Sequence, residues 1–343
     1  MRPARERLAP ASIRTLAGER EALMLGFVLA AGLVFALTNP TFLTVQNVRN
    51  IGVQSSMTIL VALGMTIVIV SGGIDLSVGA VAAVASVVSV WLITNHVTAV
   101  LAALGAAVVA TAALGLVNGL AIAYLRIPDF IATLAMMTSL RGAAYLISGG
   151  FTIRANDPQL GELANGSIGP FPLPVLIVVA AFALSHGLLR HTPLGRWLYA
   201  VGSGRDTARL AGLPVARIAI IAYVASGLLA GVAGLIAAAR TQAGSPIIGT
   251  GWELQAITIV ILGGTNLFGG SGSVTGTLLA GLLIGELNNW VSLQAYPDWA
   301  QGLVQGLILI AAVALSQRHL RARQRAARQR AARRPLDQAV RAR

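Results

Sequence analysis

The sequence has no cysteine and no lysine, and only 11% of its 343 residues are charged. The lack of cysteine excludes disulfides, thiolate metal sites and a cysteine nucleophile. The lack of lysine excludes Schiff-base chemistry and a Walker A loop, in which a lysine reaches the nucleotide phosphates. If ATP drives this protein, another chain must hydrolyse it. A soluble domain carries about 25% charged residues, so an ordinary water-soluble globule is also excluded.

The charge that is present lies mainly at the two ends of the chain. The formal net charge is +13, and fifteen of the 25 arginines lie in residues 1–21 and 318–343. We interpret both segments as cytoplasmic tails, because basic segments flank membrane spans on the inner side and attract anionic headgroups. No aromatic side chains interleave with the C-terminal arginines, which disfavours nucleic acid as their partner.

Long charge-free runs fill the region between the tails, residues 22–317. From Asn50 to Leu125 the only charge is that of Asp75. One membrane pass takes about 20 apolar helical residues, and these runs do not alternate as barrel strands would. The sequence predicts an all-α, polytopic bundle of about ten transmembrane helices. They are expected near residues 22–38, 51–71, 78–94, 98–122, 131–148, 172–189, 218–239, 252–268, 274–293 and 301–317.

The distribution of arginine predicts the orientation of these spans. Two cytoplasmic tails require an even number of spans, which ten satisfies. Loop 190–217 carries five arginines against Asp206 and is expected inside, whereas loop 149–171 carries Arg154 against two acids and is expected outside. The predicted location is therefore the cell inner membrane, with both termini cytoplasmic.

The segment from Ser71 to Gly79 reads Ser-Gly-Gly-Ile-Asp-Leu-Ser-Val-Gly and holds the isolated Asp75. Paired glycines break membrane helices, and an ionisable group at membrane depth is costly without a partner or a function. Asp75 is thus either part of a helix break beside a transport path or a cap of the helix that begins near Ser77 at the cytoplasmic surface. The helix-break candidates are Gly72, Gly73, Gly263, Gly264, Gly269 and Gly270.

Polar side chains inside the predicted spans are candidates for a solute pathway. For each of them the alternative is an interhelical hydrogen bond, which contributes about 0.6 kcal/mol on average in membranes. The pathway candidates are Asp75, Asn118, Glu286, Asn288 and Asn289.

Residues 195–214 form a basic loop with the pattern of a short amphipathic helix from about Asp206 to Ala211. Asp206 or Ser203 is expected to cap its start, and Gly212 with Pro214 to end it. A short helix between two spans suits docking to a soluble partner, while an ordinary basic inner loop is the alternative. The candidate coupling residues are Gly195, Gly202, Arg205, Asp206, Ala208, Arg209, Ala211 and Gly212.

Two pairs of segments resemble each other within the chain. Thr66-Ile-Val-Ile with the following glycines resembles Thr258-Ile-Val-Ile with its glycines, and Gly115-Leu-Val-Asn-Gly resembles Gly285-Glu-Leu-Asn-Asn. Transporters are often built from duplicated halves. Chance similarity in so simple an alphabet is the alternative.

Three motifs together resemble the ribose/xylose-type permease family, which is related more distantly to branched-chain amino-acid permeases. They are Gly-Gly-Ile-Asp-Leu-Ser-Val-Gly at 72–79, Ala-Val-Gly at 200–202 with Ala-Arg-Leu-Ala-Gly-Leu at 208–213, and the glycine-rich segment from Gly263 to Val274. The resemblance runs from about residue 45 to 317. It departs at Gly204-Arg205-Asp206, where the family more often has Asn and acidic residues.

The resemblance implies the membrane subunit of an ATP-binding-cassette sugar importer. It implies a second permease copy, as a homodimer or a heterodimer, an ATPase on a separate chain that meets 195–214, and a sugar-binding protein outside. The chain itself would bind no cofactor and no metal and would not be an enzyme. The alternatives are an ion-coupled secondary transporter, for which only Asp75 and Glu286 supply intramembrane carboxylates, and a permease for a branched-chain amino acid or nucleoside.

Overall fold

The computed structural model describes residues 11–96, 99–297 and 299–311, with the backbone alone for residues 11–20. Helices dominate the described residues, and the strands are only two residues long. The helices are α1 (Ala11–Thr38), α2 (Val45–Val70), α3 (Val78–Thr94), α4 (Val100–Ala123), α5 (Asp129–Ser148), α6 (Pro158–Asn165), α7 (Leu173–His191), α8 (Pro193–Ser203), α9 (Arg205–Leu210), α10 (Val215–Thr241), α11 (Trp252–Leu262), α12 (Val274–Leu293) and a last helix, Trp299–Ala311. The strands are β1 (Ile153–Arg154), β2 (Ser167–Ile168), β3 (Phe171–Pro172) and β4 (Ala243–Gly244).

The all-α prediction is confirmed, and a helix lies at each of the ten predicted spans. Six helices, α1 from Glu21 onward, α2, α4, α5, α7 and α10, are long and apolar enough to cross a membrane, and α3, α11 and Trp299–Ala311 are shorter apolar helices. The number of ten transmembrane passes stays a prediction. Helix α11 ends at Leu262, six residues before the predicted end, because Gly263 and Gly264 follow it. Helix α1 begins at Ala11, inside the predicted tail 1–21, and the predicted tail 318–343 lies outside the described residues.

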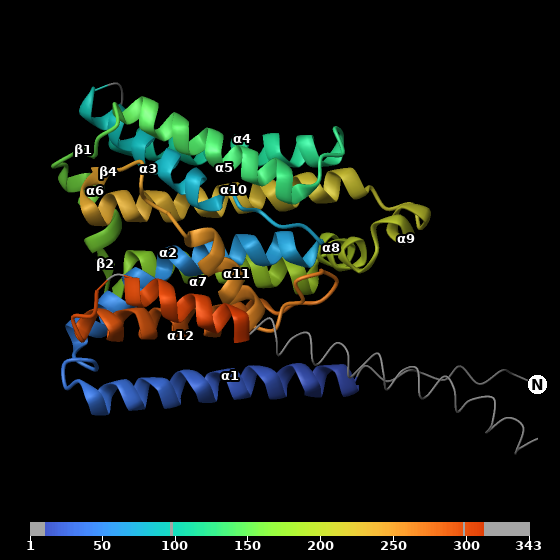
Figure 1. Cartoon of the computed structure of the whole chain (residues 1–343), viewed down its shortest axis with the longest axis horizontal. Helices are drawn as coiled ribbons and strands as arrows, with labels where there is room; N and C mark the ends of the chain where they lie inside the picture. The colour runs from blue at the N-terminus through green and yellow to red at the C-terminus, as the bar shows by residue number, and fades with distance from the viewer. Residues whose placement is uncertain (1–10, 97–98, 298, 312–343) are drawn as a thin grey trace, which may run out of the picture.

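The connections cluster at two opposite ends of the bundle. Helix α6 and the short strands lie at one end, and α8 and α9 at the other (Figure 1). At the α6 end β1 pairs antiparallel with β4, and β2 pairs antiparallel with β3. Loops 149–171 and 190–217, which were predicted on opposite sides of the membrane, therefore lie at opposite ends. Which end faces the cytoplasm stays a prediction.

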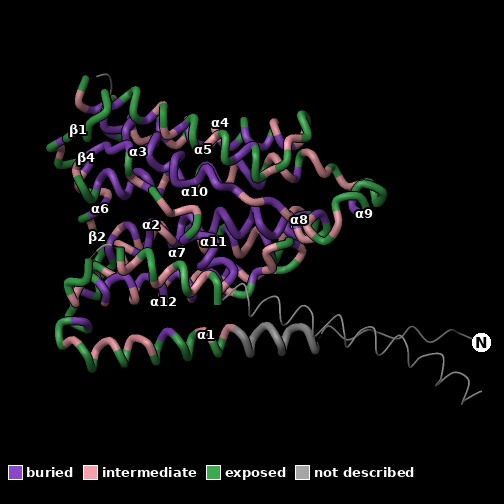
Figure 2. Tube along the Cα trace, viewed as in Figure 1, coloured by how far each residue is buried: buried purple, intermediate pink, exposed green. Residues whose placement is uncertain are grey.

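The core is built around α2, α3 and α10, whereas α1 lies at the edge of the bundle. Most side chains of α2 and α3 are buried, and those described on α1 are mainly exposed or half-buried (Figure 2). Helix α1 packs on α12. Ser273 Oγ donates a hydrogen bond of 2.7 Å to Glu21 Oε1 at one end of this contact, and Trp290 Nε1 donates one of 2.8 Å to Thr38 Oγ1 at the other.

The packing pattern reveals two similar halves, α2–α5 and α10 to Trp299–Ala311. Helix α2 packs against α10, α12 and α11, and α10 packs correspondingly against α2, α4 and α3. Equivalent helices of the two halves, such as α2 and α10, run in opposite directions along the bundle. The halves therefore form an inverted repeat (Figure 1). The short helices α3 and α11 both begin part of the way along the bundle, where a Cβ atom added to Gly249 would lie 3.0 Å from Gly79 Cα.

Only one of the two internal sequence similarities follows this repeat. Gly115 of α4 faces the backbone of Tyr223 in α10, and Gly285 of α12, 170 residues further along the chain, faces Ser55 in α2, so both glycines lie where equivalent pairs of helices cross. The other similarity aligns the end of α2 with the end of α11, which are not equivalent helices. Its physical basis is a shared helix ending: Gly72 (φ 79°) and Gly264 (φ 89°) both adopt the left-handed conformation that favours glycine.

Candidate functional site

Three glycine-containing segments that are far apart in sequence meet at the α8–α9 end of the bundle. They are Gly72 after α2, Gly202 in α8, and Gly269-Gly270 before α12. A Cβ atom on Gly269 would lie 2.8 Å from Gly72 Cα, and one on Gly202 would lie 2.6 Å from the backbone nitrogen of Gly270. The backbone N–H of Gly270 donates a 3.0 Å hydrogen bond to the Val70 carbonyl oxygen. The contact is backbone against backbone, so it leaves no space for side chains. We call it the glycine junction.

Two side chains join the coupling segment to this junction. Tyr199 Oη of α8 donates a 3.1 Å hydrogen bond to the Gly272 carbonyl oxygen, and Arg205 Nη2 of α9 donates one of 3.1 Å to the Gly72 carbonyl oxygen. Burial raises the pKa of the Tyr199 hydroxyl, so it stays a donor at neutral pH. These hydrogen bonds link α8 to the segment before α12 and α9 to the turn after α2.

The predicted short helix in 195–214 is present as α9, but it is preceded by a longer helix, α8, that the pattern did not indicate. Thr192 caps α8 by accepting a 3.1 Å hydrogen bond from the Gly195 backbone N–H. The expected cap of α9 by Ser203 or Asp206 is wrong, because Gly204 is the N-cap and makes no side-chain bond. Ser203 Oγ donates instead to the Tyr199 carbonyl oxygen at 2.8 Å.

Helix α9 presents an exposed surface at this end of the bundle. Leu210 is 90% exposed, and Asp206 forms an exposed ion pair of 3.5 Å with Arg209. Ala208 is buried against the core, and Gly212 (φ 79°) follows the helix where the chain turns back. Arg205, Ala211 and Gly212 are exposed, whereas Gly195 and Gly202 lie in packed backbone contacts.

Asp75 lies inside the bundle, where only 1% of it is exposed. Its Oδ1 accepts hydrogen bonds from the backbone N–H and the Oγ of Ser77, and its Oδ2 accepts one of 2.8 Å from Ser226 Oγ of α10. Asn118 Nδ2 of α4 donates a 2.9 Å hydrogen bond to Ser77 Oγ. Ser77 itself is the N-cap of α3 and makes no side-chain cap bond, so Asp75 supports the residue that begins the helix, at a buried rather than an exposed position.

The remaining pathway candidates occupy three different environments. Asn289 exchanges two hydrogen bonds of 2.9 Å with Asn47 of α2, which joins α12 to α2. Glu286 faces α1, since both carboxylate oxygens lie 3.7 Å from a Cβ atom built on Gly32. Asn288 lines a cavity. The structure brings Asp75 and Asn118 together but separates them from Glu286, Asn288 and Asn289.

The cavity that Asn288 lines has a volume of about 170 Å³ and lies between α2, α11, α12 and Trp299–Ala311. Gln305 Nε2 donates a 3.1 Å hydrogen bond to Asn288 Oδ1, and Gln301 Nε2 donates one of 3.1 Å to Ser292 Oγ. Sequence reasoning missed these two glutamines, although their spacing of four residues on an apolar helix places them on one face. We call this space the glutamine cavity. Its lining residues are Gln54, Ser55, Met57, Thr58, Arg240, Trp252, Gln255, Gly285, Asn288, Gln301 and Gln305.

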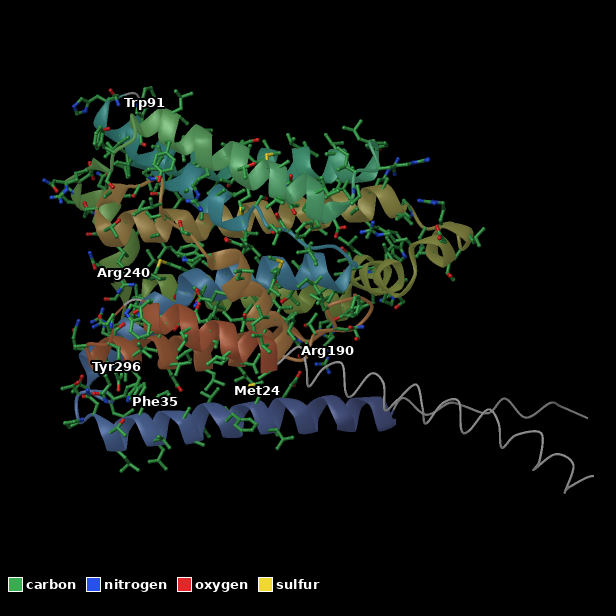
Figure 3. All side chains as sticks on the ribbon, in the orientation of Figure 1. Met24, Phe35, Trp91, Arg190, Arg240 and Tyr296 are labelled. Carbon is green, nitrogen blue, oxygen red and sulfur yellow. The ribbon has the colours of Figure 1, made fainter. Side chains whose placement is uncertain are left out.

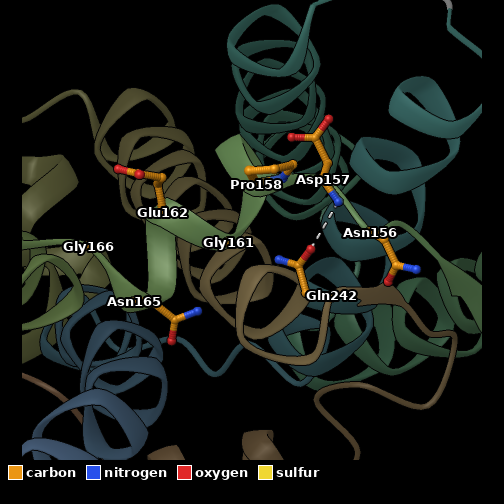
Figure 4. A pocket seen from close by; sticks show the side chains of 8 residues that line it. All are labelled: Asn156, Asp157, Pro158, Gly161, Glu162, Asn165, Gly166 and Gln242. Atoms are coloured by element: carbon orange, nitrogen blue, oxygen red, sulfur yellow. Dashed lines mark hydrogen bonds between the residues drawn. The ribbon is translucent and has the colours of Figure 1, made fainter.

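A second hollow is an open depression of about 480 Å³ at the α6 end (Figure 4). Its wall includes the carboxylates of Asp157 and Glu162, and the Asp157 backbone N–H donates a 3.2 Å hydrogen bond to Gln242 Oε1. Asp157 also caps α6 by accepting from the backbone N–H of Gln159 and Leu160. In the part of the chain that the structure describes, no group of His, Asp and Glu residues could hold a metal ion.

The family that matches this chain and its curated relatives are all described as permeases. Residues 47–313 match the family described as branched-chain amino acid transport system / permease component. The chain is 38% identical over 304 residues to the ribose import permease protein RbsC of Escherichia coli (strain K12), covering 88% of this chain and 94% of that protein. It is 38% identical to RbsC of Bacillus subtilis (strain 168), over 83% and 89% of the two chains, and 37% identical to the L-arabinose ABC transporter permease protein AraH of Azospirillum brasilense, over 85% and 87%. No solved structure matches significantly.

Proposed function

Because the chain belongs to the branched-chain amino acid transport system / permease component family, we propose that it is the permease subunit of an ATP-binding-cassette importer. Its cargo is a monosaccharide or a related sugar or polyol. Relatives at 37–38% identity over most of both chains are named as ribose and L-arabinose permeases, which supports the sugar branch over the amino-acid branch.

The glycine junction is the observation that carries this mechanism. A transporter driven by a separate ATPase needs a rigid contact that passes motion from the ATPase to the membrane helices. Helix α8 makes backbone contact with the end of α2 and with Gly270, in the segment before α12, and α9 presents Arg205, Arg209 and Leu210 beside it. ATP binding to the partner shifts the permease between two states only if the partner contacts α9 differently in each state.

The proposed assembly contains this chain as a multi-pass protein of the cell inner membrane. A second permease copy, identical or related, completes the membrane part, and separate ATPase subunits bind the α8–α9 end. A sugar-binding protein delivers the cargo at the α6 end, where the acidic depression lies. The chain itself holds no cofactor, because ATP is bound by its partner, and both termini are cytoplasmic.

Within this assembly we assign the solute pathway to the side of the bundle that contains Asn288. The hydrogen bonds of Asp75, Asn118 and Asn289 to other helices favour a structural role for these three. Glu286 faces the peripheral helix α1 rather than the cavity.

The decisive experiment reconstitutes the permease in vesicles with the ATPase and binding protein encoded beside it. We expect sugar uptake that requires both partners and ATP. Uptake by the permease alone that collapses with a proton or sodium gradient would replace the proposal with ion-coupled transport.

The coupling surface has its own test in the same vesicles. Ala211→Arg places a large charged side chain next to exposed Leu210 and should lower sugar-stimulated ATP hydrolysis severalfold while the permease still inserts. Asn95→Arg adds the same side chain to an exposed position at the opposite end and is the matched control. Unchanged hydrolysis with Ala211→Arg would remove α9 as the docking site.

A further inference from the structure

The glutamine cavity lies within a single copy of the chain, at the α6 end of the bundle. Arg240, which lines it, lies at the last turn of α10 at that end (Figure 3). Amide side chains dominate the lining, Trp252 contributes an indole, and Arg240 is its only charged group. An interior site with this many amide groups between apolar helices is costly in a membrane unless the groups are hydrogen-bonded.

One polar group of the cavity is buried without a partner among the described residues. Ser55 Oγ, in a residue that is 1% exposed, makes no hydrogen bond. The Gln255 side chain, in a residue that is 7% exposed, lines the same space. A buried unsatisfied polar group costs about 1–3 kcal/mol, so Ser55 needs water or a polar ligand as its partner.

The two halves of the inverted repeat can be compared to find which lining residues the shared fold requires and which occur only at this cavity. A shift of 170 residues relates the first residue of α2 to that of α10 and the first residue of α5 to Trp299. Most of the amides and hydroxyls of the cavity are replaced by apolar side chains at the equivalent positions of the other half, whereas Asn288 corresponds to another amide, Asn118. Gln54, Ser55 and Thr58 correspond to Val224, Ala225 and Leu228, and Gln301 and Gln305 correspond to Ile131 and Ala135.

We propose that the glutamine cavity binds one neutral monosaccharide inside each permease copy, as a station on the import route. This inference rests on the proposed function. Amide groups both donate and accept hydrogen bonds, as sugar hydroxyls do, and Gln301 and Gln305 use their Nε2 atoms for the bonds given above, while their carbonyl oxygens accept none from the described part of the chain. The indole of Trp252 offers a face for the C–H side of the ring. Arg240 disfavours a cationic amino sugar at this site.

The absence of cysteine from the chain makes a direct test possible. Single variants Thr58→Cys on α2 and Gln305→Cys on the last helix are purified in nanodiscs and labelled with a small anionic methanethiosulfonate. D-ribose or L-arabinose at ten times its dissociation constant should slow labelling at both positions about tenfold by mass action. Asn165→Cys, at the exposed last residue of α6 at the same end, should be labelled at an unchanged rate. D-glucosamine should protect neither cavity position.

Two results would overturn the proposal. One is labelling of both cavity variants that neither sugar slows, and the other is equal slowing at Asn165→Cys, which reports a nonspecific effect. Positions on two helices keep the test valid when one variant does not fold. Uptake by the wild-type permease with its ATPase and binding protein is measured in parallel. If uptake depends on ATP but sugar does not protect the cavity cysteines from labelling, the cavity site alone is ruled out. If uptake does not need the ATPase and the binding protein, the proposed function is ruled out.

Discussion

The two halves of the inverted repeat share their backbone packing but place their polar side chains in different surroundings. Beside α3 and α4, the side chains of Asp75, Ser77, Asn118 and Ser226 form a network of hydrogen bonds across three helices, in which Asn118 Oδ1 is left without a partner among the described residues. Beside α11 and α12, Ser55, Gln255 and Asn288 line open space, and Ser55 Oγ has no partner among the described residues. Duplication thus accounts for the scaffold, and the departures from symmetry mark where a ligand can enter.

The shared part of the scaffold depends on small residues rather than on hydrophobic burial between helices. Gly115 and Gly285 allow α4 and α12 to approach α10 and α2 closely, as expected where lipid removes the hydrophobic driving force. The glycine junction joins one turn of each half, Gly72 after α2 and Gly269-Gly270 before α12, to α8. A change at this junction therefore affects the two halves together.

We expect the largest effect from Gly202→Ala. The new Cβ would collide with the Val70 carbonyl and the Gly270 backbone nitrogen, neither of which can move without displacing a helix end. Overpacking costs typically about 1–3 kcal/mol, and we expect the upper part of this range here. Thermal unfolding in detergent measures it. Gly204→Ala in the same segment meets only Thr207 at 3.5 Å or more and is the control. Equal unfolding temperatures for the two variants would contradict the junction.

Asp75→Ala should destabilise the protein next most strongly, because it removes the acceptor of three hydrogen bonds in a buried network. The expected loss in unfolding free energy is about 2 kcal/mol, as buried donors of Ser77 and Ser226 lose their partner. Asp75→Asn keeps one acceptor oxygen and should lose less. The measurement is again unfolding in detergent, together with ATP-driven uptake. If Asp75→Asn abolishes uptake at unchanged stability, Asp75 belongs to the pathway and the contrast between the halves fails.

The positions of the apolar helices could be predicted from the sequence, because long uncharged helices leave a signal in composition alone. Asp75 was equally visible as the only charge between Asn50 and Leu125. Helix α8 was missed because Pro193-Leu-Gly at its start reads locally as a turn, whereas Thr192 caps it.

The assembly of the sites could not be predicted, because it depends on which side chains meet across distant helices. Asn289 and Asn288 are adjacent in sequence, yet one pairs with Asn47 and the other lines the cavity. The glycine motifs were recognisable one by one, but their meeting at Gly202 is a property of tertiary packing. The repeat was also hard to find, since the more conspicuous similarity, at Thr66 and Thr258, joins helices that are not equivalent.

The Asn47–Asn289 pair should show a small coupling. A double-mutant cycle with alanine at both positions should give an interaction free energy of about 0.6 kcal/mol, the average for hydrogen bonds between membrane helices. Asn47 and Asn118, which the structure does not join, form the control cycle and should give no coupling. A zero value for the first cycle would mean that this pair does not hold α12 against α2 and that Asn289 is open to a pathway role.

The smallest effect is expected for Glu286→Gln, and it bears on the mechanism most directly. Glu286 Oε2 makes no hydrogen bond among the described residues, and the side chain faces Gly32 of α1 instead of the glutamine cavity. We therefore expect a change in unfolding free energy within about 0.5 kcal/mol and unaltered ATP-driven uptake. An ion-coupled transporter would need this carboxylate, since Glu286 and Asp75 are the intramembrane acids that the sequence offers it. Loss of uptake in Glu286→Gln with normal insertion and normal ATP hydrolysis would therefore favour a proton- or sodium-linked route through the α1–α12 contact. Unchanged uptake would support a solute route along the amide-lined side of the bundle. That is the side on which the two halves differ in their polar side chains.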